Sequence, residues 1–408
     1  MTEVWSHAAL WLGLAVVATL FATWLRISTA LSEIVVGTVA QLAIGTFIGI
    51  EALGAKAPWI AFLSGTGAIV LTFLAGAELD PIVFRATWKE TSGLGLVAFF
   101  APFLGCTAVA FWILHWSVQA SWLAGIALST TSVAVVYAVM LEFGLNTTEY
   151  GKKILAACFI NDLATVLALG FIFAPFTFRT LVFAVVALLS FIALPWLTPR
   201  FFRRYGGRVS ELEAKYLLFI LFALGGLAAW AGSEAVLPAY IIGMVLAGTV
   251  GKDHVLVRRL RTMTFGLLTP FYFLRAGAFV SIPVLAAAPL TFVILLLAKM
   301  ITKSAAVLPT ARALGYPRKE RLYTTMMMST GLTFGTISAL FGLSHGIVDQ
   351  TQYSFLVAAV IGSAVIPTMI GNSFFLPRHL IPSAGREKEP VAAPEPATAS
   401  AASKGALS

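Results

Sequence analysis

The stretch at residues 151–170, GKKILAACFINDLATVLALG, begins with two lysines and continues as an apolar run that contains one acidic residue, Asp162. An α-helix needs about 20 mainly apolar residues to cross a bilayer, so this stretch predicts a membrane-spanning helix. At ~1.5 Å rise per residue, Asp162 lies about two to three turns from the basic end, near mid-membrane. A carboxylate there costs roughly 2.5–3.5 kcal/mol, and we therefore expect it to hold a proton or a cation.

The composition is typical of a polytopic membrane protein. Of the 408 residues, 59% are hydrophobic and only 11% are charged, whereas soluble domains carry about 25% charged residues. The mean hydropathy is +0.92. The net charge of +9 is explained by basic loops on the cytoplasmic side, so we expect no nucleic-acid partner. No group of His and Cys residues has metal-ligand spacing, and we expect neither a cofactor nor a bound transition metal.

Apolar runs of about 17–25 residues, bounded by charged or turn-forming residues, recur along the chain. They predict an all-α polytopic membrane protein with about 13 transmembrane helices. After these runs the composition shifts to Ala, Pro, Glu, Lys and Ser, so residues 383–408 are expected to form a disordered cytoplasmic tail. The predicted spans are at about 7–25, 32–51, 60–78, 93–115, 121–142, 152–173, 178–198, 213–231, 234–250, 263–283, 286–310, 321–343 and 351–376.

The distribution of Lys and Arg predicts the orientation. If the N-terminus is outside, the loops that face the cytoplasm hold 22 of the 27 Lys and Arg residues, and the opposite loops hold only Lys56 and Arg179. Cytoplasmic loops of membrane proteins are enriched in basic residues. We therefore predict an odd number of spans, with the N-terminus outside and the C-terminus inside.

Two runs of hydroxyl-bearing and small residues interrupt predicted spans in opposite halves of the chain. Residues 129–132, STTS, interrupt the fifth span, and residues 329–336, STGLTFGT, interrupt the twelfth. Small residues let helices pack closely, which is one interpretation of each run alone. Corresponding interruptions in two halves point to discontinuous helices in inverted-repeat transporters. The paired occurrence favours a transporter of this inverted-repeat kind.

Asp162 and the polar residues near it form the candidate site for a cation and a proton. A carboxyl group that titrates near neutral pH holds either a proton or a monovalent cation, and this competition is sufficient chemistry for exchange. Asn161 offers an amide oxygen as a ligand or as support for the site; otherwise it makes a hydrogen bond between helices. Thr130, Thr131 and Ser132 could supply hydroxyl or backbone carbonyl oxygens, which hard cations prefer.

Three basic residues fall within predicted spans and require partners or access to water. Lys299 and Lys303 lie four residues apart, on one face of the eleventh span. Lys303 is the nearer to the cytoplasmic end, so it either snorkels to the surface or is a gating or structural partner of the site, a role that is also open to Lys299. Arg275, in the tenth span, keeps its charge and requires an acidic partner, carbonyl groups or water.

Acidic residues at the ends of spans are the remaining candidates. Asp162, Glu78 and Glu234 are possible partners of Arg275. Glu78 and Asp80 end the third span, where they form either a solvated helix end or an acidic vestibule that concentrates cations. Glu234 opens the ninth span, where the helix macrodipole favours an anion, and we expect it to be structural.

Over about residues 10–375 the chain resembles the bacterial sodium/proton antiporters of the monovalent cation:proton antiporter superfamily. The likeness is closest to the branch that contains the Thermus-type sodium/proton antiporter and the Kef-type potassium efflux systems. The Asn-Asp pair, together with the upstream Thr-Ser run, is its most specific part. The residues that carry the resemblance are LSEIVVG at 31–37, FLAGAELD at 73–80, LSTTSVA at 128–134, FIND at 159–162, and the lysines at 299 and 303.

The resemblance implies inverted repeats with two crossing broken helices: an unwound helix crosses beside the acidic helix, and the broken helix at 329–336 completes the crossing. It implies that Na⁺ or K⁺ is bound by Asp162, Thr131 and Ser132. It also implies a homodimer in which a core domain moves like an elevator against a dimerisation domain. We therefore expect a membrane transporter domain at 1–382, with the core at about 60–175 and 263–376 and the dimerisation domain at about 7–51 and 178–250.

One position departs from the sodium/proton branch. Electrogenic members carry two adjacent aspartates, and the first can pair with a lysine that corresponds best to Lys303. Asn161 stands in the place of that first aspartate, as in electroneutral members, which implies one proton exchanged per cation and leaves Lys303 without its usual partner.

We therefore expect a secondary transporter, not an enzyme, that exchanges Na⁺ for H⁺ in the cell inner membrane and serves pH homeostasis. The alternatives are a K⁺/H⁺ antiporter or Kef-type K⁺ efflux system, and an uncoupled cation channel. The chain has no repeated carbonyl filter motif, which argues against the channel.

Overall fold

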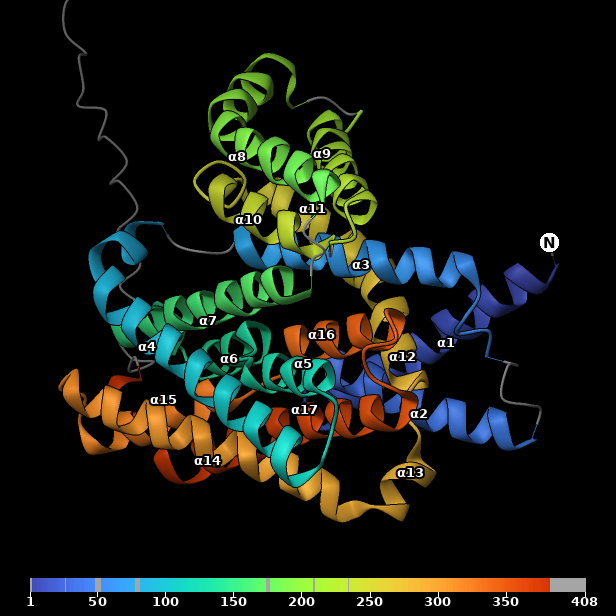
Figure 1. Cartoon of the computed structure of the whole chain (residues 1–408). Coiled ribbons are helices and arrows are strands. Elements are labelled where there is room, and N and C mark those ends of the chain that lie inside the picture. Colours follow the sequence, from blue (N-terminus) through green and yellow to red (C-terminus); the bar gives the residue numbers. More distant parts are fainter. Residues whose placement is uncertain are drawn as a thin grey trace, which may run out of the picture.

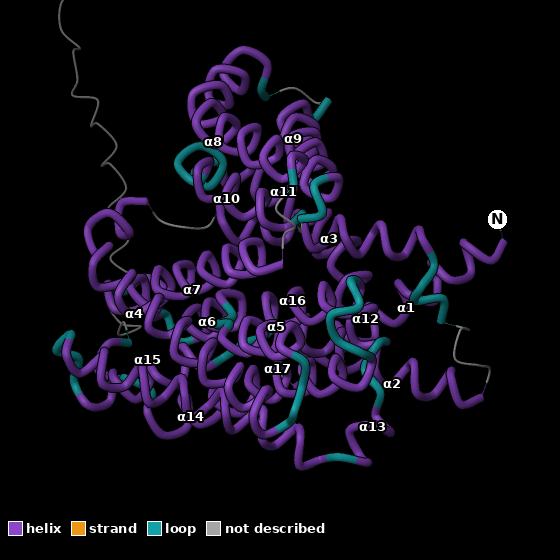
Figure 2. The backbone as a smooth tube through the Cα atoms, viewed as in Figure 1, coloured by secondary structure: helices purple, strands orange, loops and turns teal. Residues whose placement is uncertain are grey.

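The computed structural model describes residues 2–25, 27–47, 53–77, 81–173, 177–207, 210–233 and 235–381. Every regular element in these ranges is a helix (Figures 1 and 2). Within them, ten helices are long and apolar enough to cross a membrane. The predicted all-helical polytopic fold is confirmed, while the number of crossings and the sides of the termini remain predictions. Glu78, Asp80, Glu234 and the expected tail at 383–408 lie outside the described residues.

The helices alternate with short connections along the whole described chain. In order, they are α1 (Thr2–Leu25), α2 (Thr29–Phe47), α3 (Pro58–Ala77), α4 (Pro81–Ala108), η1 (Val109–Ile113), α5 (Val118–Ser129), α6 (Val133–Glu142), η2 (Leu145–Thr147), α7 (Glu149–Phe173), α8 (Phe178–Tyr205), α9 (Leu212–Trp230), α10 (Val236–Leu246), α11 (His254–Met263), η3 (Thr264–Leu268), α12 (Thr269–Ala278), α13 (Ile282–Ala287), α14 (Pro289–Ala313), α15 (Arg318–Ser329), α16 (Thr333–Ser344), α17 (Gln350–Ile370), η4 (Gly371–Phe375) and η5 (Arg378–Leu380).

One group of helices is joined by close backbone contacts at glycines. A Cβ atom on Gly37 of α2 would overlap the carbonyl group of Leu274 on α12, and a Cβ atom on Gly243 of α10 would overlap the carbonyl group of Phe73 on α3. Glycine at these positions lets the helix backbones approach each other. As a result α3 packs along α10 and α12, while α2 packs along α1 and α12.

A second group contains α4 to α7 and α14 to α17. Helix α4 packs along α5, α7 and α14, and α17 packs against α14 and α16. Figure 1 shows this group in the lower part of the view, with α1, α2 and α12 beside it and α8 to α11 on the far side of α3. The largest hydrophobic cluster fills its interior, and it includes the fully buried side chains of Ala124, Val136 and Met327.

Both predicted breaks are present. Helix α5 ends at Ser129, and Thr130 has extended backbone angles of φ −63° and ψ 150°. Helix α15 ends in the same way, with φ −67° and ψ 143° at Thr330. The backbone N–H of Ser132 donates to the carbonyl oxygen of Thr330 at 3.1 Å, so the two breaks meet. We call residues 130–132 the first break, residues 330–332 the second break, and the two together the crossing.

The ends of α8 carry basic residues stacked on tryptophans. The Arg179 guanidinium lies 5.3 Å from the ring centroid of Trp230, and that of Arg200 lies 3.7 Å from the ring centroid of Trp196. Arg179 and Arg200 are separated by about 31 Å along a helix, close to the ~30 Å hydrocarbon thickness of a bilayer. Because Trp and basic residues favour the membrane interfaces, these two pairs support the prediction that α8 crosses the membrane.

Candidate functional site

Helix α7 brings Asp162 and Asn161 into the interior of the second group of helices. Asp162 is 1% exposed and Asn161 is 0% exposed. Helix α7 packs against α4 and is contacted by α5 and α6, the two halves of the first broken helix. The predicted site residues on α7 therefore lie beside the first break.

The Asn161 amide holds the first break on both sides. Its Oδ1 accepts a hydrogen bond from the backbone N–H of Thr131 at 2.8 Å, and its Nδ2 donates to the carbonyl oxygen of Ser129 at 3.3 Å. These backbone groups have lost the partners that a continuous helix supplies. An amide can satisfy both because it carries a donor and an acceptor, whereas a carboxylate only accepts. Asn161 thus supports the broken backbone directly.

The Asp162 carboxyl group has a different environment. Its Oδ1 is buried and has no hydrogen-bond partner among the described residues. Buried polar atoms in proteins are nearly always paired, so each unpaired one calls for an explanation. An oxygen in this setting is suited to receive a proton or a monovalent cation.

The hydroxyl groups of the first break are already engaged. Thr131 Oγ1 donates to the carbonyl oxygen of Met328 at 2.8 Å, and Thr130 Oγ1 donates to that of Ala127 at 3.0 Å. Ser132 Oγ accepts from the N–H of Val135 at the start of α6, at 3.4 Å. The three predicted ligand residues are all buried at the crossing, and Thr131 links the first break to the end of α15.

Two lysines of α14 extend into the crossing. Lys303 Nζ donates to Thr131 Oγ1 at 2.6 Å, and Lys299 Nζ donates to the carbonyl oxygen of Thr130 at 3.2 Å. Both side chains are 0% exposed. The prediction that they share one helix face is confirmed, and the snorkelling alternative for Lys303 is wrong, because its ammonium group lies inside the protein. Lys303 is also near enough to Asp162 for the two charges to interact.

The second break also involves Gly331, within the predicted interruption, and Ser363, which the sequence analysis did not name. A Cβ atom on Gly331 would overlap Lys299 Nζ, so glycine leaves room for the ammonium group. Ser363 Oγ on α17 lies 3.4 Å from the carbonyl oxygen of Gly331 and 2.8 Å from that of Val360. Gly331 falls in the interrupted run, which was a usable signal, whereas Ser363 resembles any small residue of an apolar helix.

Arg275 makes its contacts outside the crossing. Its Nε donates to the carbonyl oxygen of Ala55 at 2.9 Å, and its guanidinium lies 5.0 Å from the ring centroid of Phe279. An acidic residue, carbonyl groups and water were the partners considered for Arg275, and in the structure its partner is a carbonyl group. Its proposed partners Glu78 and Glu234 lie outside the described residues, so neither they nor a vestibule at Glu78 can be placed.

A family model and the relatives of this chain agree on one family of membrane transport proteins. Residues 12–375 match the family described as "Sodium/hydrogen exchanger, transmembrane". A glutathione-regulated potassium-efflux system protein KefC from Shigella sonnei is 26% identical over 381 residues, which cover 83% of this chain and 58% of that protein. A probable Na⁺/H⁺ antiporter 3 from Methanocaldococcus jannaschii is 26% identical over 332 residues, which cover 76% of this chain and 83% of that protein. The chain thus spans little more than half the length of the KefC relatives.

Solved structures show the same fold. The sodium proton antiporter MjNhaP1 from Methanocaldococcus jannaschii at pH 8 superposes with a TM-score of 0.65 over 91% of this chain and 96% of its own, at 15% sequence identity. A second structure of MjNhaP1, from an electron-microscopy map, has a TM-score of 0.69 over the same coverage.

Proposed function

Because this chain belongs to the sodium/hydrogen exchanger family, a family of multi-pass cation/proton antiporters, we propose that it exchanges Na⁺ for H⁺ at Asp162. The observation that supports this most directly is the buried, unpaired Oδ1 of Asp162 beside two broken helices. A carboxylate in that position binds either a proton or a cation, but not both at once.

Coupling follows from the cost of moving a bare charge through a low-dielectric interior. When Asp162 carries a proton or a monovalent cation, the charge of its carboxyl group is neutralised, and the site can change its access from one side of the membrane to the other. The unoccupied carboxylate resists that movement because burial without a partner is expensive. Exchange therefore requires an occupied site in each direction.

We propose a stoichiometry of one proton per cation. The Asn161 amide is used to hold the backbone of the first break, and it does not titrate. Lys299 and Lys303 both donate to oxygens of the first break. In this proposal neither lysine gains or loses a proton during the cycle, so the only charge that changes is that of Asp162.

The moving part is proposed to comprise α4 to α7 and α14 to α17, sliding against a group formed by α1, α2, α3, α8 to α10 and α12. This differs from the division expected from the sequence, which placed α3 and α12 in the core. The packing of α3 along α10 and of α12 along α2 supports the new boundary. The exposed apolar faces of α1 and α8 are candidate surfaces for a homodimer or for lipid.

K⁺ is the runner-up substrate. The name of the KefC relatives refers to potassium efflux and that of the archaeal relative to Na⁺/H⁺ antiport, at the same identity of 26%. Both cations take oxygen ligands. We also propose that the protein lies in the cell inner membrane and has a role in pH homeostasis.

Asp162→Asn tests the mechanism in proteoliposomes that contain a pH-sensitive dye. Added Na⁺ should drive proton movement in the wild type, and the variant should fall to the rate of protein-free liposomes, because an amide neither titrates nor neutralises a cation. Glu149→Gln is the matched control on the same helix, since the Glu149 side chain is 79% exposed, and it should retain the wild-type rate. Wild-type exchange by Asp162→Asn would refute the mechanism.

The same preparation tests substrate and stoichiometry. Response to K⁺ but not to Na⁺ would select the runner-up, and cation current without proton movement would select the channel. A K⁺ gradient with valinomycin can impose a membrane potential while Na⁺ is the test cation. One-for-one exchange moves no net charge, so the initial rate should not change, and acceleration by the potential would contradict the proposed stoichiometry.

A further inference from the structure

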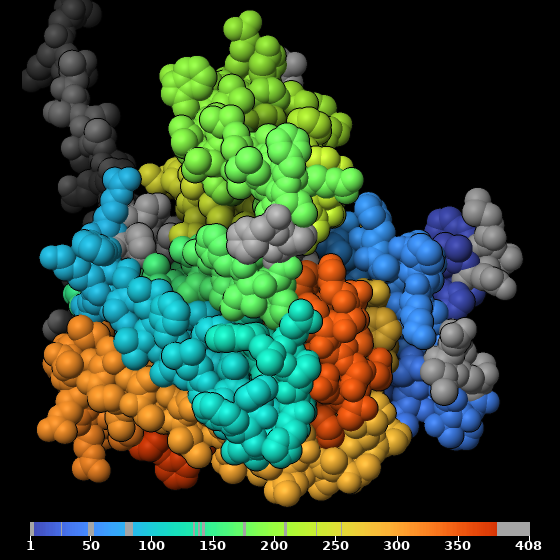
Figure 3. Space-filling view, in the orientation of Figure 1, coloured from blue at the N-terminus to red at the C-terminus, as the bar shows by residue number. Residues whose placement is uncertain are grey.

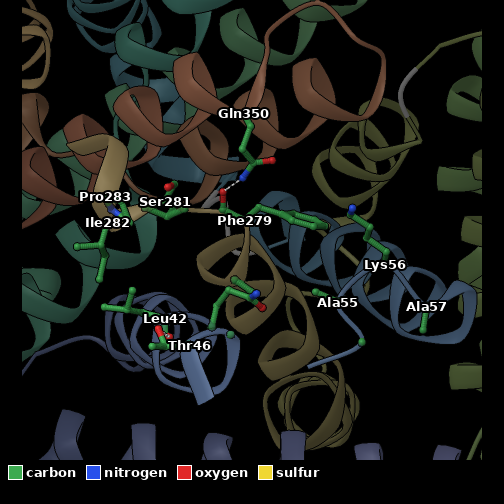
Figure 4. Close-up of a pocket in the computed structure, with 15 residues that line it drawn as sticks. Leu42, Thr46, Ala55, Lys56, Ala57, Phe279, Ser281, Ile282, Pro283 and Gln350 are labelled. Atoms are coloured by element: carbon green, nitrogen blue, oxygen red, sulfur yellow. Dashed lines mark hydrogen bonds between the residues drawn. The ribbon is translucent and has the colours of Figure 1, made fainter. Parts of the chain in front are cut away.

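A cavity of about 650 Å³ lies at the C-terminal ends of α2 and α12, and it includes no residue of the crossing. Its walls are the last turns of α2, residues 54–57, residues 278–283, and Gln350 at the start of α17 (Figure 4). In the space-filling view the blue residues of α2 and the gold residues of α12 and α13 lie on the same side of the molecule (Figure 3).

Among the described residues, the charged side chains that line this cavity or lie directly behind its wall are basic. Lys56 lines it and is exposed. Arg275 lies behind the wall, bonded to the carbonyl oxygen of Ala55 and stacked on the ring of Phe279, and both of these residues face the cavity. None of the described lining residues is acidic. Asp349 precedes Gln350, but its carboxylate caps α17 through the N–H of Gln352 at 2.7 Å.

This charge pattern separates two possible roles. A vestibule that delivers cations is favoured by acidic side chains, which raise the local cation concentration. Lys56 and Arg275 produce the opposite field. The cavity is therefore suited to a negatively charged group.

The remaining lining and the position of the cavity indicate what carries that group. Leu42, Ile282 and Pro283 give one side of the cavity an apolar surface. Leu42 is 40% exposed and Phe47, at the end of α2, is 87% exposed, so this side continues into the outer face of the helix. Because α2 is long and apolar enough to cross the membrane, its end lies at the level of the lipid headgroups.

We propose that this cavity binds the headgroup of an anionic phospholipid, with the phosphate at Lys56 and the upper acyl chain against Leu42 and Ile282. A phosphate group pairs well with a lysine ammonium. An inorganic phosphate ion shares this chemistry but leaves the apolar side of the cavity unused.

The test uses the full-length protein, delipidated in detergent and titrated with phosphatidylglycerol or phosphatidylcholine, with bound lipid counted by native mass spectrometry. One basic residue near a membrane surface contributes about fivefold in affinity for anionic lipid, so the wild type should prefer phosphatidylglycerol by about that factor or more. Lys56→Gln should remove most of the preference. Thr46→Trp, which fills the cavity without changing charge, should weaken binding of both lipids.

Arg179→Gln is the matched control, because Arg179 is the other basic residue predicted on this side of the membrane and stacks on Trp230. It should leave the preference unchanged. An equal loss in Arg179→Gln, or no preference in the wild type, would overturn the proposal. A free phosphate ion is the other possible ligand. If inorganic phosphate raises the thermal unfolding midpoint of the wild type but not of Lys56→Gln, and the wild type shows no preference between the lipids, the cavity is a free-phosphate site and the lipid assignment is overturned. If Lys56→Gln does not fold, the Thr46→Trp variant tests the proposal: weaker binding of both lipids supports it, and unchanged binding overturns it.

Discussion

The two breaks at the crossing begin with nearly the same backbone angles, at Thr130 and Thr330, but are held by different groups. Asn161, Lys299 and Lys303 reach the first break from α7 and α14 with an amide and two ammonium groups. The second break is held by a serine hydroxyl and by the first break itself, through the N–H of Ser132, while the hydroxyl of Thr131 bonds to Met328 at the end of α15. The first break is therefore the one whose support depends on strong donors and on charge, and the second largely follows it.

The largest effect is expected from Asn161→Leu. The substitution leaves the N–H of Thr131 and the carbonyl group of Ser129 buried without partners, at roughly 1–3 kcal/mol each. Exchange should be lost and the thermal unfolding midpoint should fall clearly. Asn372→Leu is the control, since Asn372 accepts one hydrogen bond from Tyr323 far from the crossing, and it should cost less. Equal losses of exchange and of thermal stability in the two variants would show that the amide of Asn161 has no specific role in supporting the first break.

Gly331→Ala tests whether the second break depends on the lysine that supports the first. The added methyl group would displace Lys299 Nζ from the carbonyl oxygen of Thr130, and overpacking of this kind costs about 1–3 kcal/mol. The double variant Gly331→Ala with Lys299→Met should recover part of that loss in a double-mutant cycle of unfolding. Gly226→Ala is the control, because nothing lies within 4 Å of its added Cβ. Strict additivity in the cycle would show that the two breaks are independent.

Lys303→Met should change the affinity for the exchanged cation more than it changes the free energy of unfolding. Lys303 interacts electrostatically with Asp162 and donates to Thr131, so its charge repels a cation bound there. The apparent KM for Na⁺ in proteoliposomes should fall by about threefold to tenfold, as expected for loss of roughly 1 kcal/mol of repulsion. Lys299→Met is the comparison, with a smaller expected change because Lys299 binds the Thr130 carbonyl oxygen instead. A higher KM in Lys303→Met would instead assign Lys303 to assembly of the cation site.

Ser363→Ala should have the smallest effect. Its hydroxyl lies 2.8 Å from the carbonyl oxygen of Val360 on its own helix and only 3.4 Å from that of Gly331. We expect a loss of about 0.5–1.5 kcal/mol in the free energy of unfolding and an exchange rate close to that of the wild type. Ser190→Ala on the exposed face of α8 should change neither quantity. Loss of exchange in Ser363→Ala would mean that the second break has its own side-chain support.

The regular parts of the fold were predictable because membrane insertion imposes a length and a composition that appear in the sequence. Each long apolar helix lies on one of the predicted spans. The two breaks were predictable as well, since hydroxyl-bearing and small residues stand at equivalent places in the two halves. The helix grouping was not predictable to the same extent. The partners of α3 and α12 depend on close backbone contacts at glycines such as Gly37 and Gly243, whose counterparts are distant in sequence.

The sequence by itself determined the membrane class and the broken helices, and it indicated Asp162 as the candidate site, because burial of a carboxylate is costly wherever it occurs. Only the tertiary structure decided what its neighbours do. Lys303 bonds to Thr131 across 172 positions of the chain, and Arg275 bonds to Ala55 across 220. Long side chains reach whichever oxygen the packing brings near them, and that information is not present in the local sequence. The same is true of Asn161, whose amide became the support of a backbone 30 residues away.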